Sequence, residues 1–505
     1  MLHNKVGEVK SYSLFGRFSL LVLLTFSSTY AETFSEFKRV QLKSFKSYKD
    51  EKDNDFSKYL KAKFRAYLVQ NSKPLYEKPK PKQILPTNPR KIKPVGPKIN
   101  LHVKTTEPKE SEQKVKEQKV ELNVLDKKIV VVSKTKPEIE KTQKDIKFDF
   151  FGSELGFDTP NGIKEARFYP QNQEGIANFF DIAASSEYEY ILQDIKTLSK
   201  KMNLNDWGVY LLIERISDAV FSNKDDSKLF SWFIFNKLGY AVKVGLANRH
   251  VVLMHYSKKT IYSTPSYKFS NKNYYVLANY AKKRLGRIYS YPQDYPDSLK
   301  DFDLSLETLP ILNSAISSKT LSFKHLNKQY SLSFDYDNNL IDFMATYPQA
   351  DYETFFNAPL DDITYKAIAT SLKKYVDGMK ASDALNFVLN FVQKAFIYQR
   401  DDEQFGREKV MFAQETLYFD KSDCEDRAVL FSYLVKELFS LGVVGVKYSD
   451  HMATALYIPM KGDIVKSGSK RLVLADPTYV NASIGQSMPK YKHVQPESFI
   501  VVRKN

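Results

Sequence analysis

The stretch SDCEDRAVLFSYL at residues 422–434 decides the fold expected for the C-terminal part of the chain. Its polar residues lead directly into an apolar pattern with helical spacing, which predicts a helix that begins near Cys424. The free N–H groups and the dipole of a helix N-terminus favour the thiolate form of a cysteine placed there. Cys424 is the single cysteine of the 505 residues, which excludes an intramolecular disulfide and a cysteine-rich zinc site.

Three strands are expected after this helix. They cover residues 443–448, 451–458 and 472–475, and the last ends at Asp476-Pro477. A thiol, an imidazole at His451 and a carboxylate at Asp476 therefore follow in the order of a nucleophile, a general base and the group that orients the base. The alternatives are an inert buried cysteine and a core histidine with satisfied hydrogen bonds.

These segments together resemble the transglutaminase-like cysteine peptidase superfamily, and bacterial envelope members in particular. The resemblance spans roughly residues 380–505 and rests on short motifs that include His451: Asp402-Glu403-Gln404-Phe405-Gly406, Glu415-Thr416-Leu417, Asp423-Cys424-Glu425-Asp426 and Leu474-Ala475-Asp476-Pro477. It implies an α+β fold in which a papain-like or transglutaminase-like helix packs on an antiparallel sheet, with Cys424, His451 and Asp476 as the catalytic residues. Ser422 replaces the glycine usual in the family, and the tryptophan that the family usually has upstream of the cysteine is absent. The oxyanion-hole side chain is therefore open; Gln404 is the candidate, beside the backbone N–H of Cys424.

Three acidic residues surround the thiol position. Asp423, Glu425 and Asp426 stabilise the helix dipole as first-turn carboxylates, but their charges also raise a thiol pKa unless Arg427 offsets them. Their oxygen ligands would alternatively suit Ca²⁺. The chemistry itself requires no cofactor, so calcium is an optional expectation.

A second copy of the pattern lies upstream. Leu229-Phe230-Ser231-Trp232 matches Leu430-Phe431-Ser432-Tyr433, and His250 and His451 each lie 20 residues after the matched phenylalanine. In this register Asn223 occupies the position of Cys424, and Thr264 that of Asp476. We therefore expect two tandem modules, the first of them degenerate and without a nucleophile; chance similarity of apolar helices is the alternative.

The chain divides by composition into five segments. We expect a signal peptide over 1–31, an amphipathic helical segment over 32–75, a basic Lys/Pro-rich linker over 76–147, the degenerate module over 148–310 and the catalytic module over 311–505. Within the last, residues 330–336 alternate as a strand does, and 340–347 is expected to be a second strand.

The linker carries much of the positive charge. Residues 77–147 contain no aromatic residue, and residues 76–145 hold 18 Lys/Arg against 10 Asp/Glu, a net charge of +8 out of +17 for the chain. This segment cannot bury enough apolar surface to fold alone, so we expect an extended spacer. Because about half of the net charge lies in the linker, the argument for a nucleic-acid groove on the globular part is weak, and we expect no nucleic-acid partner. Association with a membrane or envelope surface through the N-terminal helix and the linker stays open.

These features predict an exported enzyme. A basic start and the apolar run at residues 18–26 are typical of a signal peptide, with an uncleaved inner-membrane anchor as the alternative, and both place the protein in the periplasm or outside the cell. The expected function is thiol-dependent processing of an amide or peptide bond in a protein or peptide of the cell envelope, with hydrolysis favoured over transamidation. The alternative is a non-catalytic envelope binding or scaffold protein with the same fold.

Overall fold

The computed structural model describes residues 34–103, 144–277 and 285–503. Three segments lie outside the described residues: the expected signal peptide, residues 104–143 of the expected linker, and residues 278–284. No helix in the described ranges is both long enough and apolar enough to cross a membrane. Contacts divide the chain after Lys52 into an N-terminal part and a body of residues 53–505.

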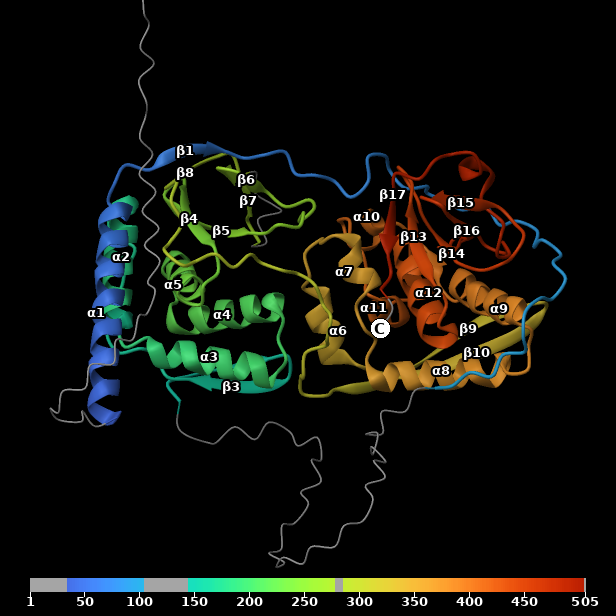
Figure 1. Ribbon diagram of the computed structural model, residues 1–505, viewed down its shortest axis with the longest axis horizontal. Coiled ribbons are helices and arrows are strands. Elements are labelled where there is room, and N and C mark those ends of the chain that lie inside the picture. The colour runs from blue at the N-terminus through green and yellow to red at the C-terminus, as the bar shows by residue number, and fades with distance from the viewer. Residues whose placement is uncertain (1–33, 104–143, 278–284, 504–505) are drawn as a thin grey trace, which may run out of the picture. The chain divides into compact units, whose positions relative to one another are not determined.

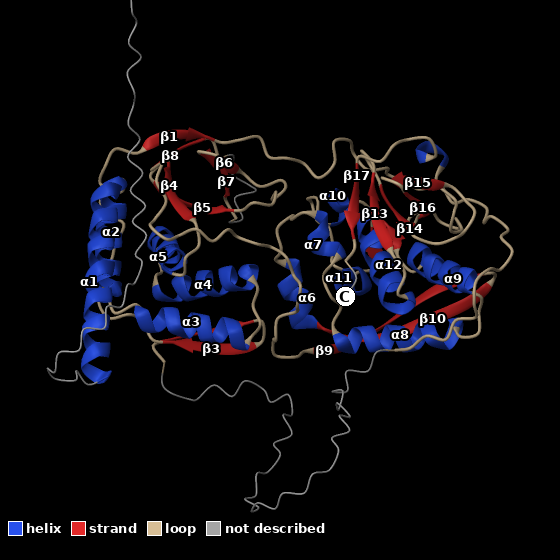
Figure 2. Ribbon diagram, in the orientation of Figure 1, coloured by secondary structure: helices blue, strands red, loops and turns tan. Residues whose placement is uncertain are grey.

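The first half of the described chain combines helices with a curved antiparallel sheet (Figures 1 and 2). Its elements are α1 (Phe34–Leu60), β1 (Arg65–Leu68), β2 (Ile146–Phe150), β3 (Ser153–Phe157), α2 (Gln173–Ser185), α3 (Glu189–Lys201), α4 (Asp206–Val220), α5 (Lys224–Lys237), β4 (Val242–Ala247), β5 (His250–Tyr256), β6 (Ser266–Phe269), β7 (Lys272–Tyr275) and β8 (Arg287–Ser290).

Six of these strands form one sheet in the order β1-β8-β4-β5-β7-β6. A bridge between Gln70, just after β1, and Ser266 of β6 brings the two edges together, so the sheet is nearly a closed barrel. Closure gives hydrogen-bond partners to backbone N–H and C=O groups that would be unpaired at the edges of an open sheet. Helix α5 packs on β4 and β5 and is almost entirely buried.

The second half is again α+β. Its elements are β9 (Ile316–His325), β10 (Lys328–Asp337), α6 (Asn338–Ala345), α7 (Tyr352–Phe356), α8 (Asp362–Val376), α9 (Ala381–Lys394), β11 (Ile397–Tyr398), α10 (Asp401–Gln404), α11 (Ala413–Tyr418), β12 (Lys421–Ser422), α12 (Cys424–Phe439), β13 (Val443–Lys447), β14 (Met452–Leu456), β15 (Ile464–Ser467), β16 (Lys470–Ala475) and β17 (Ser498–Val501).

Helix α12 packs on an antiparallel sheet of five strands in the order β15-β16-β14-β13-β17. The sheet contacts involve β13 and β14, the strands that follow the helix in sequence. The expected helix on an antiparallel sheet is therefore present, and its start at Cys424 is confirmed.

The same strand order occurs in both halves. In each half one helix, α5 or α12, is followed by five strands. The sheet order of the first half is β8-β4-β5-β7-β6, and that of the second half is β17-β13-β14-β16-β15. Taken in chain order, β4 to β8 therefore correspond to β13 to β17. His250 begins β5 and His451 directly precedes β14, as the sequence register requires. The predicted position of Thr264 is wrong. Asp476 follows the hairpin of β15 and β16, whereas Thr264 lies before the corresponding hairpin of β6 and β7.

Two local expectations also change. Residues 340–347 were expected to form a strand, but Asn338–Ala345 is helix α6. The Asp337 carboxylate accepts the N–H of Asn339 and caps this helix at 2.9 Å, and Leu340, Ile341, Phe343 and Met344 are buried at helical spacing. In the 32–75 segment, helix α1 ends at Leu60 and the strand β1 follows.

Residues 70–103, which we call the strap, have an extended conformation but are attached to the C-terminal half. Backbone hydrogen bonds join Lys78 to Ser449 at 3.3 Å, Thr87 to Val480 at 3.0 Å and Ile99 to Met379 at 2.8 Å. Figure 1 shows the strap in blue between β1 and the end near α8. The composition predicts the extended backbone, and the attachment is supplied by contacts that lie hundreds of residues away in sequence.

The two ends of α1 differ in burial, which predicts different costs of mutation. Phe56 is 2% exposed and contacts the rings of Phe180, Trp232 and Tyr295, whereas Phe37 is 51% exposed. We expect Phe56→Ala to lower the free energy of unfolding by about 3–5 kcal/mol because it opens a cavity. Phe37→Ala, the control, should change it by about 0.5 kcal/mol or less. Denaturant unfolding measures both, and equal effects would contradict this packing.

Candidate active site

Helix α12 is fixed at its first turn by its own acidic residues and by Arg427. The Asp426 carboxylate accepts the backbone N–H of Asp423 at 3.0 Å and that of Met411 at 2.8 Å. The Arg427 guanidinium is buried and donates to Ser422 Oγ at 3.0 Å and to the carbonyl of Phe396 at 2.9 Å. Burial lowers the pKa of Arg427 to about 10. These contacts set the position of the Cys424 backbone relative to the end of α9.

His451 and Asp476 form a buried hydrogen-bonded pair. Nε2 of His451 lies 2.9 Å from Oδ2 of Asp476. Oδ1 of the same carboxylate accepts the N–H groups of Thr478 and Tyr479 at 2.9 and 3.1 Å, so its orientation is fixed by the turn after β16. A carboxylate partner places the proton on Nε2, which leaves the lone pair on Nδ1; that atom has no hydrogen-bond partner among the described residues.

Tyr491 stacks on His451 and lies within electrostatic range of Cys424 and Asp476. Its ring stacks on the His451 ring with centroids 4.9 Å apart and planes 18° apart. The charges of Asp450, Cys424 and Asp476 all act on its hydroxyl and, after burial, raise the pKa of Tyr491 above its usual range. Cys424 and Asp476 are therefore both within electrostatic range of one tyrosine whose ring covers the imidazole.

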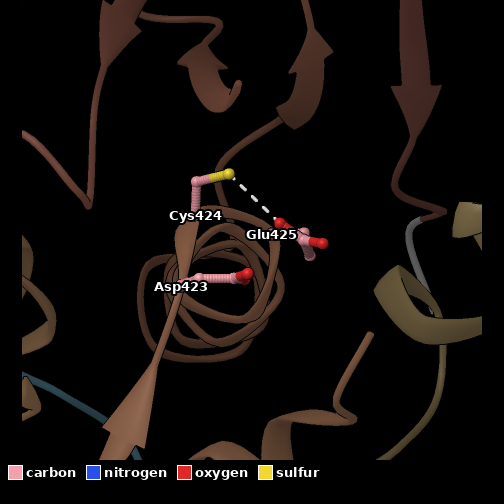
Figure 3. A group of neighbouring side chains, drawn as sticks. All are labelled: Asp423, Cys424 and Glu425. Atoms are coloured by element: carbon pink, nitrogen blue, oxygen red, sulfur yellow. Dashed lines mark hydrogen bonds between the residues drawn. The ribbon is translucent and has the colours of Figure 1, made fainter. Parts of the chain in front are cut away.

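The thiol of Cys424 is buried and surrounded by acidic groups. Figure 3 shows its sulfur turned toward Glu425, whose carboxylate oxygen Oε2 accepts the thiol hydrogen at 3.1 Å. The hydroxyl of Tyr76 lies 3.9 Å from the sulfur and 3.2 Å from the same carboxylate oxygen. Burial raises the pKa of Cys424 well above its usual value, and the charges of Glu425 and Asp423 raise it further. These effects outweigh the expected stabilisation of a thiolate by the helix N-terminus.

Lys80, from the strap, supplies the positive charge that compensates these acids. Its ammonium lies 3.2 Å from Asp401, 2.6 Å from Asp423 and 2.5 Å from Glu408, and it pairs with Glu425 as well. Burial alone would lower the pKa of Lys80, but the carboxylates outweigh it and raise that pKa well above its usual value. Arg427, the cation expected in this role, instead binds the backbone carbonyls at the end of α9.

The three acids expected to bind calcium have different roles. The Asp426 oxygens accept backbone N–H groups, whereas Asp423 and Glu425 face the Lys80 ammonium. Carboxylate oxygens of Asp401, Asp423 and Asp426 come within 4.8 Å of one another, so the donor set itself suits a hard cation. With the Lys80 ammonium between these groups, calcium remains an expectation of the sequence and carries no step of the chemistry below.

Gln404 lies at the end of the short helix α10, and its buried Oε1 has no hydrogen-bond partner among the described residues. Asp401 of the same helix reaches Lys80, so α10 borders the acidic cluster. The structure gives no direct contact between Gln404 and Cys424, and its role at the oxyanion stays a prediction.

The corresponding histidine of the first half is in a different environment. The side chain of His250 is 72% exposed, and its Nδ1 lies 3.0 Å from an oxygen of Asp225 in the first turn of α5. Asn223 caps α5 by accepting the N–H groups of Asp225 and Asp226. The position expected to correspond to Cys424 is thus a helix cap with no nucleophile.

Sequence reasoning missed Tyr76, Lys80, Asp401 and Tyr491. Tyr76 is the last aromatic residue before the aromatic-free stretch, which is a weak signal. Asp401 directly precedes the acidic motif at 402–406. Lys80 is one lysine among many in its segment, so no local signal distinguishes it.

Comparisons with known proteins leave the family open: no family model, curated protein or solved structure matches this chain.

The Lys80 ion pairs predict a pH-dependent loss of stability. Lys80→Met leaves buried carboxyl groups whose pKa values are already raised by burial, that of Asp401 to about 8. Since such groups bind more protons in the folded state, stability falls as pH rises. We expect a loss of about 3–5 kcal/mol near neutral pH, smaller at about pH 5 and larger at about pH 8.

Thermal and denaturant unfolding across this pH range test the expectation. Lys82→Met is the matched control, because Lys82 is exposed on the same segment. A loss that does not depend on pH, or an equal loss in the control, would contradict the role given to Lys80.

Proposed function

We propose that this chain is a thiol-dependent enzyme that hydrolyses an amide or peptide bond through Cys424, His451 and Asp476. The observation that carries the proposal is the buried pair of His451 and Asp476. Nδ1 of His451 has no hydrogen-bond partner among the described residues, and the ring stacks on Tyr491, whose pKa is raised in part by the charge of Cys424. An inert core histidine would have both nitrogens satisfied or lie among apolar side chains alone.

The reaction begins when Nδ1 of His451 takes the proton from the Cys424 thiol. The sulfur attacks the carbonyl carbon, a C–S bond forms, and the carbonyl oxygen becomes an oxyanion. The C–N bond then breaks, and the leaving amine takes the proton from Nδ1. Water attacks the thioester carbon while Nδ1 accepts one of its protons. The C–S bond then breaks, the acid product leaves, and the Cys424 sulfur takes the proton back from Nδ1.

Two fixed groups assist these steps. Asp476 holds the tautomer with hydrogen on Nε2 and stabilises the imidazolium, and the turn at Thr478 and Tyr479 prevents the carboxylate from rotating away. N–H groups in the first turn of a helix have no intrahelical acceptor, so the N–H of Cys424 is the donor available to an oxyanion at this place.

The second candidate is a non-catalytic binding or scaffold protein. It is favoured by one observation, the complete burial of the Cys424 thiol, which raises the pKa of that thiol. A catalytic cysteine must become accessible and ionised during turnover, whereas a structural one need not. Reaction of Cys424 with a thiol alkylator under conditions of turnover discriminates the two.

The setting of the reaction belongs to the same proposal. Export by the N-terminal segment 1–31 would place the enzyme in the periplasm or outside the cell, where its substrate would be a protein or peptide of the cell envelope. The first half, which carries His250 but no thiol beside it, would bind substrate or support the second half without chemistry of its own.

Substitutions at the three residues test the function. Cys424→Ala and His451→Ala should each lower hydrolysis of a fluorogenic peptide-amide library by several orders of magnitude, because triad residues act as a unit. Asp476→Asn should lower it less, since the nucleophile and base remain. Because Tyr76 lies beside the thiol, each variant is measured in the intact chain and in the Tyr76→Ala background.

His250→Ala is the matched control for His451→Ala, because the two histidines hold corresponding positions before or at the start of the second strand. It should leave the rate of the chemical step nearly unchanged. Full activity of Cys424→Ala would rule out the enzymatic proposal.

A further inference from the structure

The strap brings two side chains onto the nucleophile from a segment far away in sequence. Tyr76 contacts both the Cys424 sulfur and the Glu425 carboxylate, and Lys80 fills the space among four carboxylates next to them. Cys424 has no exposed surface, and the Lys80 side chain is 3% exposed. A substrate carbonyl cannot reach the sulfur while these two side chains stay in place.

The attachment of the strap is distributed along its length. Beyond Lys80, the carbonyl of Pro81 accepts the Tyr398 hydroxyl at 2.7 Å, the Asn88 carbonyl accepts the Gln486 side chain at 3.1 Å, and Val95 N–H donates to Ser382 Oγ at 2.8 Å. Each of these hydrogen bonds contributes about 1 kcal/mol. Leu75 and Leu101 of the strap are also buried in the main hydrophobic core, so the strap is held by many weak hydrogen bonds, by these two apolar side chains and by one group of ion pairs.

The ion pairs also determine what can replace the strap. If Lys80 leaves, Asp401, Asp423 and Glu425 remain buried with a side-chain exposure of 1% or less and with no compensating charge. Uncompensated buried charge is strongly unfavourable, so these groups must either take up protons or gain another cation. Displacement of the strap is therefore favoured when another cationic group enters the same space.

We propose that the strap is an intramolecular inhibitor, and that the substrate which displaces it places a lysine-type ammonium group among the carboxylates that now bind Lys80. The inference rests on the proposed function, because it takes Cys424 as the nucleophile. It assigns the acidic cluster as a specificity subsite that selects a positive side chain close to the bond attacked.

Access to the thiol gives the first measurement, which does not depend on turnover. Iodoacetamide should modify Cys424 slowly in the intact chain and about ten-fold faster in Tyr76→Ala, because accessibility governs thiol reactivity. Tyr76→Phe is the matched control, since it keeps the ring over the sulfur, and its rate should stay near that of the wild type. Because Cys424 is the only cysteine, mass spectrometry of the intact protein reports this site alone.

The second measurement tests the subsite. In a Tyr76→Ala/Lys80→Ala double variant, the peptide acetyl-Gly-Lys-Gly-amide should slow the alkylation of Cys424 and raise the melting temperature. The same peptide with norleucine in place of lysine has a similar length without the charge and should do neither. Circular dichroism checks that the double variant is folded; if it is not, Tyr76→Ala alone with the same two peptides serves instead.

The outcomes separate this inference from the proposed function. Fast alkylation of the intact chain, or no acceleration in Tyr76→Ala, overturns the inhibitory strap, and equal effects of the two peptides overturn the ammonium subsite. If alkylation and peptide protection behave as expected but no peptide amide is hydrolysed, the strap and its subsite stand and the hydrolytic function fails.

Discussion

The ammonium group of Lys80 is the interaction on which the structure around Cys424 depends. Four carboxylates face one cation, and three of them are almost completely buried. Burying that many carboxylates next to a thiol costs free energy that is offset by an opposite charge at contact distance or by the uptake of protons. The cation comes from an extended segment with no regular structure of its own, so the charge balance of the site depends on attachment of the strap.

This charge balance explains the state of the thiol. A cysteine at the start of a helix is expected to ionise readily, but burial and the charges of Glu425 and Asp423 have the opposite effect and raise the pKa of Cys424. If the strap is the inhibitor proposed above, its displacement exposes the sulfur to water and reverses burial, the largest of these causes, so the step that opens access to the thiol also favours its ionisation.

The two halves show how one arrangement of elements carries different chemistry. A helix followed by five strands occurs twice with the same strand order, but only the second half has a thiol at the helix start and a buried imidazole–carboxylate pair. In the first half the helix begins after a capping asparagine, and His250 is exposed and pairs with the helix itself. Sheet order follows from apolar packing and connection length, whereas chemistry depends on single side chains at the ends of elements.

The sequence by itself determined the helix that starts at Cys424, the strand preceded by His451 and the turn at Asp476, because helical spacing, strand alternation and turn residues are local signals. It also predicted the extended backbone of the strap from its composition. It misplaced Thr264 and took α6 for a strand, since short apolar segments suit both helix and strand until packing chooses between them. Only the tertiary structure decided that Tyr76 and Lys80 lie on the thiol, that Arg427 faces the end of α9, and that Tyr491 lies against His451. The physical reason is that these contacts join residues tens to hundreds of positions apart, and their energy comes from burial and from opposite charges meeting in space, which no local pattern in the sequence encodes.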